Sequence, residues 1–391
     1  MLSKLINFLS DCLNIFVNSI CLNFSFSYIF ELKKMSKKVL IVGSQGYLGS
    51  RLTGYLLDHG YQCKGIDTGF FNNGTLTPIN FEDVVKKDAR SIVKNDLQGF
   101  DVLILLAGIS NDPFGHMSSE QIYDPTRDYA LKIASMCKEL SIQFIYPSSC
   151  SVYGASSDGL LSEDGQTNPQ TPYSINKLQV ENGLSLIADQ TFSPIALRFG
   201  TVYGVSPRIR FDVVINMLCG LALTTKKVTL NSNGQAWRPH LHIDDACESF
   251  RCCIDWNPNI GKLTILNVGQ NEDNYKIIDI AKIIHSNVNG SELTYLDGNH
   301  DEEGNELIKD RKIQDGVDTR SYKVLFDKIS QTLPGFECKW SVEKGIKNLL
   351  GELRKIKFDS KSFNKRDFYR LQQIEFLHNS QQINDDLFWV K

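Results

Sequence analysis

Tyr173 and Lys177 are the residues of this chain best suited to acid–base chemistry. They lie four positions apart in a segment with helical patterning, so both side chains fall on one helical face. A lysine ammonium beside a phenol stabilises the phenolate and lowers the tyrosine pKa from about 10 towards neutrality, which makes Tyr173 a candidate general acid or base. Chance supplies roughly 1.5 such pairs in a chain of this composition, so the meaning of the spacing depends on the surrounding motifs.

A cluster of hydroxyl side chains precedes this pair, in the segment Tyr146-Pro-Ser-Ser-Cys-Ser-Val-Tyr-Gly154. The apolar stretch before it predicts a strand, so the serines stand at the carboxyl edge of the expected sheet, where folds of this kind bind ligands. A serine-rich loop is most often only a turn. Tyr173 and Lys177 downstream favour the catalytic interpretation.

A glycine-rich loop, Gly43-Ser-Gln-Gly46-Tyr-Leu-Gly49, joins the first predicted strand to the first predicted helix. Gly43 permits a tight turn, Gly46 lets the backbone approach a pyrophosphate, and Gly49 allows close helix packing. Asp67 closes the next strand, 24 residues after Gly43, where a carboxylate accepts hydrogen bonds from a ribose and repels a 2′-phosphate. The pattern predicts NAD rather than NADP, and a structural turn with a surface aspartate is the alternative.

Further residues are predicted to line the same cofactor. Asp88 is placed to accept a hydrogen bond from the adenine amino group, although a plain surface carboxylate is nearly as good an interpretation. Leu106, Ala107 and Gly108 end a strand where the cofactor would pass. The predicted cofactor-binding set is Gly43, Gln45, Gly46, Tyr47, Leu48, Gly49, Asp67, Asp88, Ala89, Leu106, Ala107, Gly108, Tyr173 and Lys177.

Apolar runs that alternate with helical patterns must position these motifs. Short runs rich in β-branched residues predict strands at 39–42, 61–66, 101–107, 142–146 and 193–198. Amphipathic segments predict helices at 52–59, 125–140, 173–188, 211–223, 243–254, 275–286 and 342–355, with Pro125 in a first turn. This alternation predicts an α/β fold, a Rossmann-like doubly wound parallel sheet with a smaller interleaved C-terminal substrate lobe.

We divide the chain into four segments. An N-terminal extension covers residues 1–34, an NAD-binding Rossmann domain residues 35–204, a substrate-binding lobe interleaved with the last sheet strands residues 205–358, and a C-terminal tail residues 359–391. We expect the tail to form a surface helix with loops.

The extension at residues 1–34 has three interpretations: an appendage or an upstream start read in error before Met35, a membrane-associated helix, or a signal peptide. Asn and Asp residues interrupt its apolar run, which argues against a membrane span. No small-residue cleavage site precedes Met35, which argues against a signal peptide. We therefore favour the appendage, and any membrane contact is expected only through these residues.

Composition excludes several classes of function. A formal net charge of −3 over 391 residues gives no basic surface for nucleic acid. Ten cysteines without any Cys-x-x-Cys pair predict reduced thiols and a cytoplasmic location. The seven histidines show no metal-ligand spacing, so we expect no metal.

Together these motifs resemble the extended short-chain dehydrogenase/reductase family, in its nucleotide-sugar epimerase and dehydratase branch, over residues 37–353 approximately. The resemblance implies that Ser149 hydrogen-bonds the reacting hydroxyl, that Tyr173 is the base, and that Lys177 binds the nicotinamide ribose and tunes Tyr173. It also implies a homodimer formed through parts of the segments 125–140 and 173–188.

The same resemblance implies contacts to a nucleotide-sugar substrate. Arg238 matches the arginine that would contact a nucleotide diphosphate, for which a forked guanidinium is well suited. A structural salt bridge with Asp244 or Asp245 is the alternative role. The implied substrate-binding set is Ser110, Ser149, Ser151, Thr201 and Arg238.

Departures from the family pattern narrow the reaction. Family dehydratases and decarboxylases carry a glutamate, often preceded by aspartate, where this chain has Ser151 preceded by Cys150. Eliminating water needs that additional acid or base, so dehydration and decarboxylation are disfavoured. Asp124 and Thr201 stand where the family usually has asparagine, which leaves the identity of the sugar open.

The sequence therefore predicts an NAD-dependent epimerase that acts on a nucleotide-activated sugar by transient oxidation at C4 and hydride return. An NAD(P)-dependent sugar reductase or dehydrogenase with the same three catalytic residues is one alternative. A catalytically silent NAD-binding regulator is another.

Overall fold

The computed structural model of the protein describes residues 37–79, 83–110, 119–155, 159–256, 258, 260–295 and 320–390. The predicted N-terminal extension, residues 1–34, lies outside the described residues. A seven-stranded sheet runs in the order β11-β7-β5-β4-β1-β2-β3, and every neighbouring pair is parallel. Its strands are β1 (Lys38–Val42), β2 (Gln62–Asp67), β3 (Val84–Lys86), β4 (Val102–Leu105), β5 (Gln143–Ser149), β7 (Ile195–Phe199) and β11 (Thr264–Val268).

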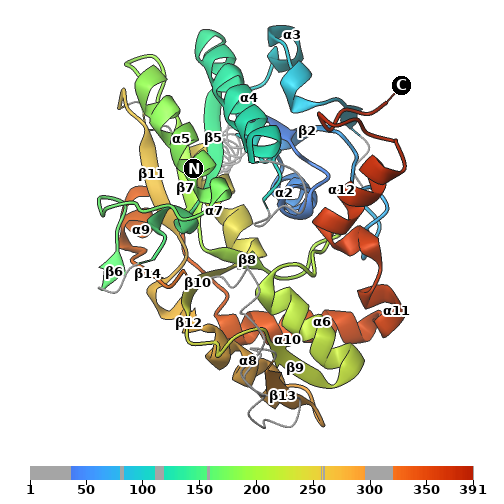
Figure 1. The fold of residues 1–391 in the computed structure, drawn as a ribbon. Helices are drawn as coiled ribbons and strands as arrows, with labels where there is room; N and C mark the ends of the chain where they lie inside the picture. Colours follow the sequence, from blue (N-terminus) through green and yellow to red (C-terminus); the bar gives the residue numbers. More distant parts are fainter. Residues whose placement is uncertain are drawn as a thin grey trace, which may run out of the picture.

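Helices cover both faces of this sheet (Figure 1). On β1, Val39 and Ile41 pack into the cluster that contains α2 and α7, whereas Leu40 and Val42 pack into the cluster that contains α4 and α5. Both faces of the strand are buried, as its unbroken apolar run predicted. The doubly wound α/β prediction is confirmed. The helices are α2 (Tyr47–Asp58), α4 (Ser119–Glu139), α5 (Pro172–Ile187) and α7 (Ile243–Asp255).

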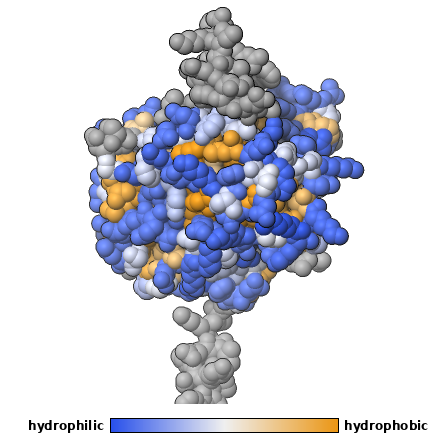
Figure 2. All heavy atoms as spheres, turned by 90° about the horizontal axis from the view of Figure 1, so that it is seen from below, coloured by the Kyte–Doolittle hydropathy of each residue, from blue (hydrophilic) through white to orange (hydrophobic). Residues whose placement is uncertain are grey.

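A smaller lobe, drawn below the sheet in Figure 1, has its own hydrophobic cluster, built mainly by α6, α8 and α10. Seen from this end, the surface is mostly hydrophilic with separate hydrophobic patches (Figure 2). The lobe helices are α6 (Val214–Thr225), α8 (Ile277–Ser286) and α10 (Val342–Lys355). Three small sheets lie outside the seven-stranded sheet: β12-β10-β8, β13-β9 and β14-β6. Their strands are β6 (Leu160–Leu161), β8 (Thr201–Tyr203), β9 (Lys227–Leu230), β10 (Trp237–His242), β12 (Asn274–Lys276), β13 (Glu292–Tyr295) and β14 (Lys323–Val324).

The prediction that Pro125 opens a helix is wrong. α4 begins at Ser119, so Pro125 lies inside the helix. Tyr123, which comes before the proline, is buried at 4% exposure, and its backbone carbonyl accepts a hydrogen bond from the Asn176 amide at 2.5 Å. These tertiary contacts outweigh the local preference of proline for a first turn.

The C-terminal tail forms the predicted surface helix with loops, and it also packs closely on the rest of the chain. It contains α11 (Ser360–Phe363), the 3₁₀ turn η4 (Arg366–Phe368) and α12 (Arg370–Asn379). Apolar side chains of the tail are buried against the rest of the chain rather than exposed. They are Phe363, Phe368, Ile374, Leu377, Ile383 and Leu387.

A buried ion pair joins α5 to the centre of the sheet. Glu181 on α5 and Arg198 on β7 are 1% and 3% exposed, and two hydrogen bonds of 3.0 and 2.6 Å connect them. The Ser148 hydroxyl donates to the same carboxylate at 2.5 Å, and Arg198 donates to the Tyr153 hydroxyl at 2.9 Å. Tyr153 donates in turn to Asn267 on β11 at 2.8 Å. The network therefore fixes α5 relative to β5, β7 and β11.

We expect Glu181→Gln to destabilise the fold by about 3–5 kcal/mol, because it leaves the buried Arg198 charge without its counter-ion. Urea unfolding followed by circular dichroism measures the change. Glu343→Gln is the matched control, since Glu343 pairs with Lys347 on the exposed face of α10 and should lose little stability. Equal losses in the two variants would contradict the role of the buried pair.

Candidate active site

Tyr173 and Lys177 lie in the first turns of α5, as predicted. Thr171 caps the helix by accepting a hydrogen bond from the Ser174 amide, and Pro172 occupies the first turn. The Lys177 Nζ atom donates to the Pro147 carbonyl of β5 at 2.6 Å and lies 5.6 Å from the centre of the Tyr173 ring. Burial lowers the pKa of Lys177 to about 7, and Glu181 partly opposes this change.

Ser149 ends β5, two residues after the carbonyl that Lys177 contacts. Its hydroxyl caps the 3₁₀ turn η2 (Cys150–Tyr153) by accepting a hydrogen bond from the Ser151 amide at 3.1 Å. The hydroxyl of the adjacent Ser148 donates a hydrogen bond to the Glu181 carboxylate. Of the two serines that end β5, Ser149 is therefore the one whose hydroxyl is outside the buried ion-pair network.

Ser151 occupies the position of the missing dehydratase glutamate. It is 6% exposed, and its hydroxyl has no hydrogen-bond partner among the described residues. Cys150 beside it is fully buried, with a thiol that donates to the Arg198 carbonyl at 3.2 Å, and burial raises its thiol pKa. Neither side chain is a carboxylic acid, so this segment supplies no second acid or base.

The glycine loop connects β1 to α2 at the point where the strand order reverses, between β1 and β4. Gly43 has φ +94°, and a Cβ there would lie 2.5 Å from the Ala107 amide nitrogen at the end of β4. A Cβ on Gly49 would lie 2.1 Å from the Gly43 carbonyl oxygen. These two glycines are required by the turn itself and by helix packing. A Cβ on Gly46 would lie 3.4 Å from the same oxygen, so the surrounding backbone restricts this position less.

Asp67 ends β2 beside this loop. Its carboxylate accepts hydrogen bonds from the Gln45 amide at 2.9 Å and the Gly69 amide at 2.8 Å. Burial raises its carboxyl pKa, while these amides and the charges of Arg208 and Arg370 act in the opposite direction. The strand end, the loop and the carboxylate thus meet as predicted.

The carboxylate of Asp88, the predicted adenine contact, forms hydrogen bonds with a neighbouring residue of the chain. Its carboxylate caps η1 (Ala89–Ser91) and forms a two-pronged ion pair with the Arg90 guanidinium, with hydrogen bonds of 2.8 and 2.7 Å. Ala89 is buried beneath it at 6% exposure. At the end of β4, the Ala107 carbonyl accepts from Tyr129 at 3.0 Å.

The predicted substrate residues lie on different elements. Ser110 follows β4, Thr201 begins β8, and Arg238 lies on β10, which pairs with β8. Arg238 is 8% exposed and donates to the backbone carbonyls of Trp237, at 2.8 Å, and Arg320, and its guanidinium lies 5.3 Å from the Tyr322 ring. Its position beside β8 places it in the lobe rather than at the glycine loop.

The alternative partners of Arg238 are engaged elsewhere. Asp244 pairs with Arg51 of α2 at 2.7 Å, and Asp245 accepts hydrogen bonds from the backbone amides of Lys339 and Trp340. Both aspartates are therefore held by other partners, and the Arg238 guanidinium donates to backbone carbonyls instead.

Sequence reasoning missed three arginines near the glycine loop and Asp67. Arg208 and Arg210 follow Gly204 and are 4% and 9% exposed, and Arg370 comes from the C-terminal tail. The Ser110 hydroxyl accepts from Arg210 at 2.9 Å and from Arg370 at 3.1 Å. The alternating Arg-Ile-Arg sequence at 208–210 was a signal for the first two. No local pattern marked Arg370.

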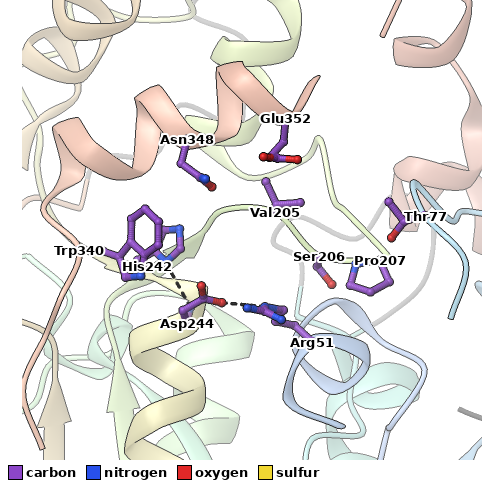
Figure 3. Close-up of a pocket in the computed structure, with 10 residues that line it drawn as sticks. All are labelled: Arg51, Thr77, Val205, Ser206, Pro207, His242, Asp244, Trp340, Asn348 and Glu352. Carbon is purple, nitrogen blue, oxygen red and sulfur yellow. Dashed lines mark hydrogen bonds and ion pairs between the residues drawn. The ribbon is translucent and has the colours of Figure 1, made fainter. Parts of the chain in front are cut away.

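A separate cavity of about 280 Å³ is lined by residues of α2, α7 and α10 and of the segment that follows β8 (Figure 3). The Arg51–Asp244 ion pair and His242, stacked on Trp340 at 4.2 Å between ring centres, form one wall. None of the predicted catalytic, cofactor or substrate residues lines it. Its full lining is Arg51, Thr77, Val205, Ser206, Pro207, His242, Asp244, Trp340, Asn348 and Glu352.

Within the described segments, no group of three or more His, Cys, Asp or Glu side chains is arranged to hold a metal ion. None of the helices in those segments has both the length and the apolar character needed to cross a membrane.

Residues 39–269 match the family model of the NAD dependent epimerase/dehydratase family. The chain belongs to this family. The match includes the glycine loop, Asp67, Ser149, Tyr173, Lys177 and Arg238. Membership confirms that the protein is an enzyme of an NAD-dependent family and that the predicted resemblance holds.

Several known proteins are similar to this chain. The uncharacterized UDP-glucose epimerase YtcB of Bacillus subtilis is 29% identical over 266 residues, which is 63% of this chain and 82% of that protein. The UDP-glucose 4-epimerase of Thermotoga maritima, solved with UDP-glucose, matches with a TM-score of 0.68 at 19% identity, over 81% of this chain and 99% of that one. The UDP-glucuronic acid 4-epimerase of Bacillus cereus, solved with UDP-glucuronic acid and NAD, gives 0.65 at 23% identity, over 82% and 99%. These structures share the fold.

We expect Gly43→Ala to lower NAD affinity by about tenfold or more, because a side chain at φ +94° is strained and its Cβ collides with the end of β4. Gly54→Ala is the matched control, since a Cβ there meets nothing within 4 Å and alanine suits the middle of α2. Titration with NADH followed by fluorescence measures both affinities. Unchanged binding by Gly43→Ala would contradict the assignment of the loop.

Lys177 should make folding stability depend on pH. Its folded-state pKa of about 7 lies below its ordinary value of 10.5, so folding releases a proton between these pH values. The penalty for the buried ammonium is complete below pH 7 and is relieved as the pH rises. The stability of the wild type relative to Lys177→Met should therefore be flat below about pH 7 and increase above it. Urea unfolding at pH 6 to 9.5 tests this, and a difference independent of pH would contradict it.

Proposed function

We propose that this protein is an NAD-dependent epimerase that oxidises a nucleotide-activated sugar transiently at C4 and restores it with inverted configuration. One observation carries the proposal. The α5 residue Lys177 contacts the β5 carbonyl of Pro147 at 2.6 Å, which brings Tyr173 and Lys177 to the strand end that carries Ser149. The three side chains that the reaction needs are therefore supplied by two adjoining elements.

The residues at the carboxyl edge of β1 and β2 fit the dinucleotide. The tight turn at Gly43 sets the amino terminus of α2 at the end of β1, where it would attract an anion, and the Asp67 carboxylate beside it would accept hydrogen bonds from a ribose. When bound, NAD would supply the hydride acceptor for oxidation of the sugar carbon and the hydride donor for reduction of the ketosugar. We assign to its binding the loop from Gly43 to Gly49, with Asp67 and the strand end at Leu106–Gly108.

The chain's own residues handle the proton. Tyr173 takes it from the sugar hydroxyl during oxidation and gives it back during reduction. Lys177 lies close enough to stabilise the phenolate by its charge, and Ser149 holds the sugar oxygen by a preorganised hydrogen bond.

The surroundings of these residues support epimerisation over dehydration. Ser151 supplies no carboxylic acid. Glu181, one turn after Lys177, is held by Arg198 and Ser148 and is buried at 1% exposure. Neither residue can act as the extra acid that elimination requires, so reversible hydride transfer is the chemistry that the site supports best.

The names of the similar proteins support a proposal for the substrate class. Their names describe UDP-glucose epimerases and a UDP-glucuronic acid 4-epimerase, so we propose a UDP-hexose or a related nucleotide sugar. Arg238, with Thr201 on the neighbouring strand, is the proposed contact to the diphosphate and sugar.

We also propose a homodimer formed through α4 and α5. On α5, Ile175 and Leu186 are 41% and 87% exposed and lie eleven residues apart, which is three turns and therefore one face. Large apolar side chains on an outer helical face favour burial by a second copy.

Tyr173→Phe should lower the epimerisation rate by about 10²–10⁴-fold, because the ring keeps its packing but loses the proton carrier. NAD binding should persist. Tyr295→Phe on the lobe strand β13 is the matched control and should keep full activity. Product formation from a panel of UDP-sugars is measured by chromatography, with NADH absorbance recorded alongside. Wild-type activity in Tyr173→Phe would refute the mechanism, and steady net NADH formation would favour a dehydrogenase.

A further inference from the structure

The C-terminal tail lies against the Rossmann part of the chain, beside α2 and β2 (Figure 1). Its buried residues Ile374, Leu377, Ile383 and Leu387 share a hydrophobic cluster with Phe70, which follows β2, and Tyr123 of α4; Tyr173 packs against the same cluster. Gln373 donates to the Phe70 carbonyl at 3.0 Å. The tail therefore covers the edge of the sheet where the cofactor site is assigned.

Arg370 projects from the start of α12 to the glycine loop. Its Nη1 atom donates to the Gly108 carbonyl at 3.2 Å and to the Ser110 hydroxyl at 3.1 Å. Its Nη2 atom lies 3.7 Å from the position that a Cβ of Gly46 would occupy. The guanidinium thus spans from the end of β4 to the residue at which the loop backbone is expected to approach a pyrophosphate.

Three arginine side chains lie near the glycine loop. Arg210 donates to the same Ser110 hydroxyl as Arg370. Burial lowers the pKa of Arg370 to about 9, and repulsion from Arg210 acts in the same direction. Arg208 is 4% exposed, and its Nε and Nη1 atoms have no hydrogen-bond partner among the described residues. Asp212 pairs with Arg210 at 2.7 Å, and Asp67 faces Arg208 and Arg370. Three guanidinium groups beside a helix amino terminus favour a further anion.

The last residues of the tail contact the chain where β2 ends and beside β3. The Trp389 indole donates to the carbonyl of Thr68, directly after Asp67, at 2.7 Å, and Lys86 of β3 lies over its ring at 4.4 Å. Arg90, which holds Asp88, donates to the Leu387 carbonyl at 3.1 Å and stacks on Phe388 at 3.4 Å. These contacts join the tail to the strand ends assigned to the adenosine half of the cofactor.

We propose that the C-terminal segment, residues 359–390, forms a second wall of the dinucleotide site, in which Arg370 binds the pyrophosphate and the Trp389 end retains the adenosine. The inference rests on the assignment of the Gly43–Gly49 loop to NAD. The tail contacts the rim of the site at Thr68, Phe70, Gly108 and Ser110. The Asp67 carboxylate keeps its hydrogen bond from the Gln45 amide of the glycine loop. A wall of this kind suits an enzyme that reuses its cofactor in every turnover, because it slows release.

Arg370→Ala tests the pyrophosphate contact, with Lys365→Ala as the charge-matched control on an exposed position of the same tail. We expect Arg370→Ala to weaken the binding of NAD and ADP by about 10- to 100-fold and to leave adenosine binding nearly unchanged, because the lost contact is charge-assisted and made only to phosphate. Lys365→Ala should bind all three ligands like the wild type. Affinities are measured by calorimetry on the full-length chain after removal of cofactor.

Trp389→Ala provides an independent test that leaves Arg370 in place. Removing the Trp389 indole should speed NAD release in a stopped-flow displacement experiment. It should also weaken the binding of adenosine as well as that of NAD. Circular dichroism confirms that each variant is folded.

Other outcomes overturn the inference. Unchanged NAD and ADP affinity in Arg370→Ala, or equal losses for adenosine and ADP, would remove the pyrophosphate role. Tighter NAD binding in either tail variant would show that the tail competes with the cofactor instead of holding it. If Gly43→Ala still weakens NAD binding in these cases, only the role of the tail fails; if Gly43→Ala also binds normally, the assigned cofactor site fails with it.

Discussion

The buried Glu181–Arg198 ion pair is the contact on which the geometry of the active site depends. It joins α5, which carries Tyr173 and Lys177, to β7 in the centre of the sheet. Through Ser148 it also holds the end of β5, next to Ser149. Removing two charges from water is costly, and the bidentate geometry and the added hydrogen bonds offset that cost. The fold thus keeps Tyr173, the proposed base, together with Lys177 and Ser149.

The local parts of this arrangement could be predicted from the sequence. The first strand, the glycine turn and α2 follow from short-range constraints: an apolar run buried on both faces, a backbone angle that only glycine adopts readily, and close helix packing at Gly49. The position of Tyr173 and Lys177 follows from helical periodicity and from the Thr171–Pro172 helix start. For the same reason, the helix at Val342–Lys355 was predicted with its observed bounds.

Contacts between distant segments could not be predicted in this way. Ser148 and Ser149 are adjacent and chemically alike, and only the position of Glu181 assigns the first to the structural network. Pro125 lies inside α4 because packing around Tyr123 overrides its local preference. Arg370 is more than 300 residues from the glycine loop, and the tail that carries it has no regular pattern to show which surface it covers. Pairing of this kind depends on tertiary structure, which spacing rules do not contain.

The central claim is that the sugar's own C4 hydrogen leaves as hydride and returns to the same carbon. The most direct measurement uses UDP-hexoses carrying deuterium at C4, with the products examined by mass spectrometry and NMR. The account predicts an epimerised product that retains the deuterium, and no incorporation from D₂O when unlabelled substrate is used. Loss of the label to solvent, or an oxidised product with a stoichiometric amount of NADH, would contradict it.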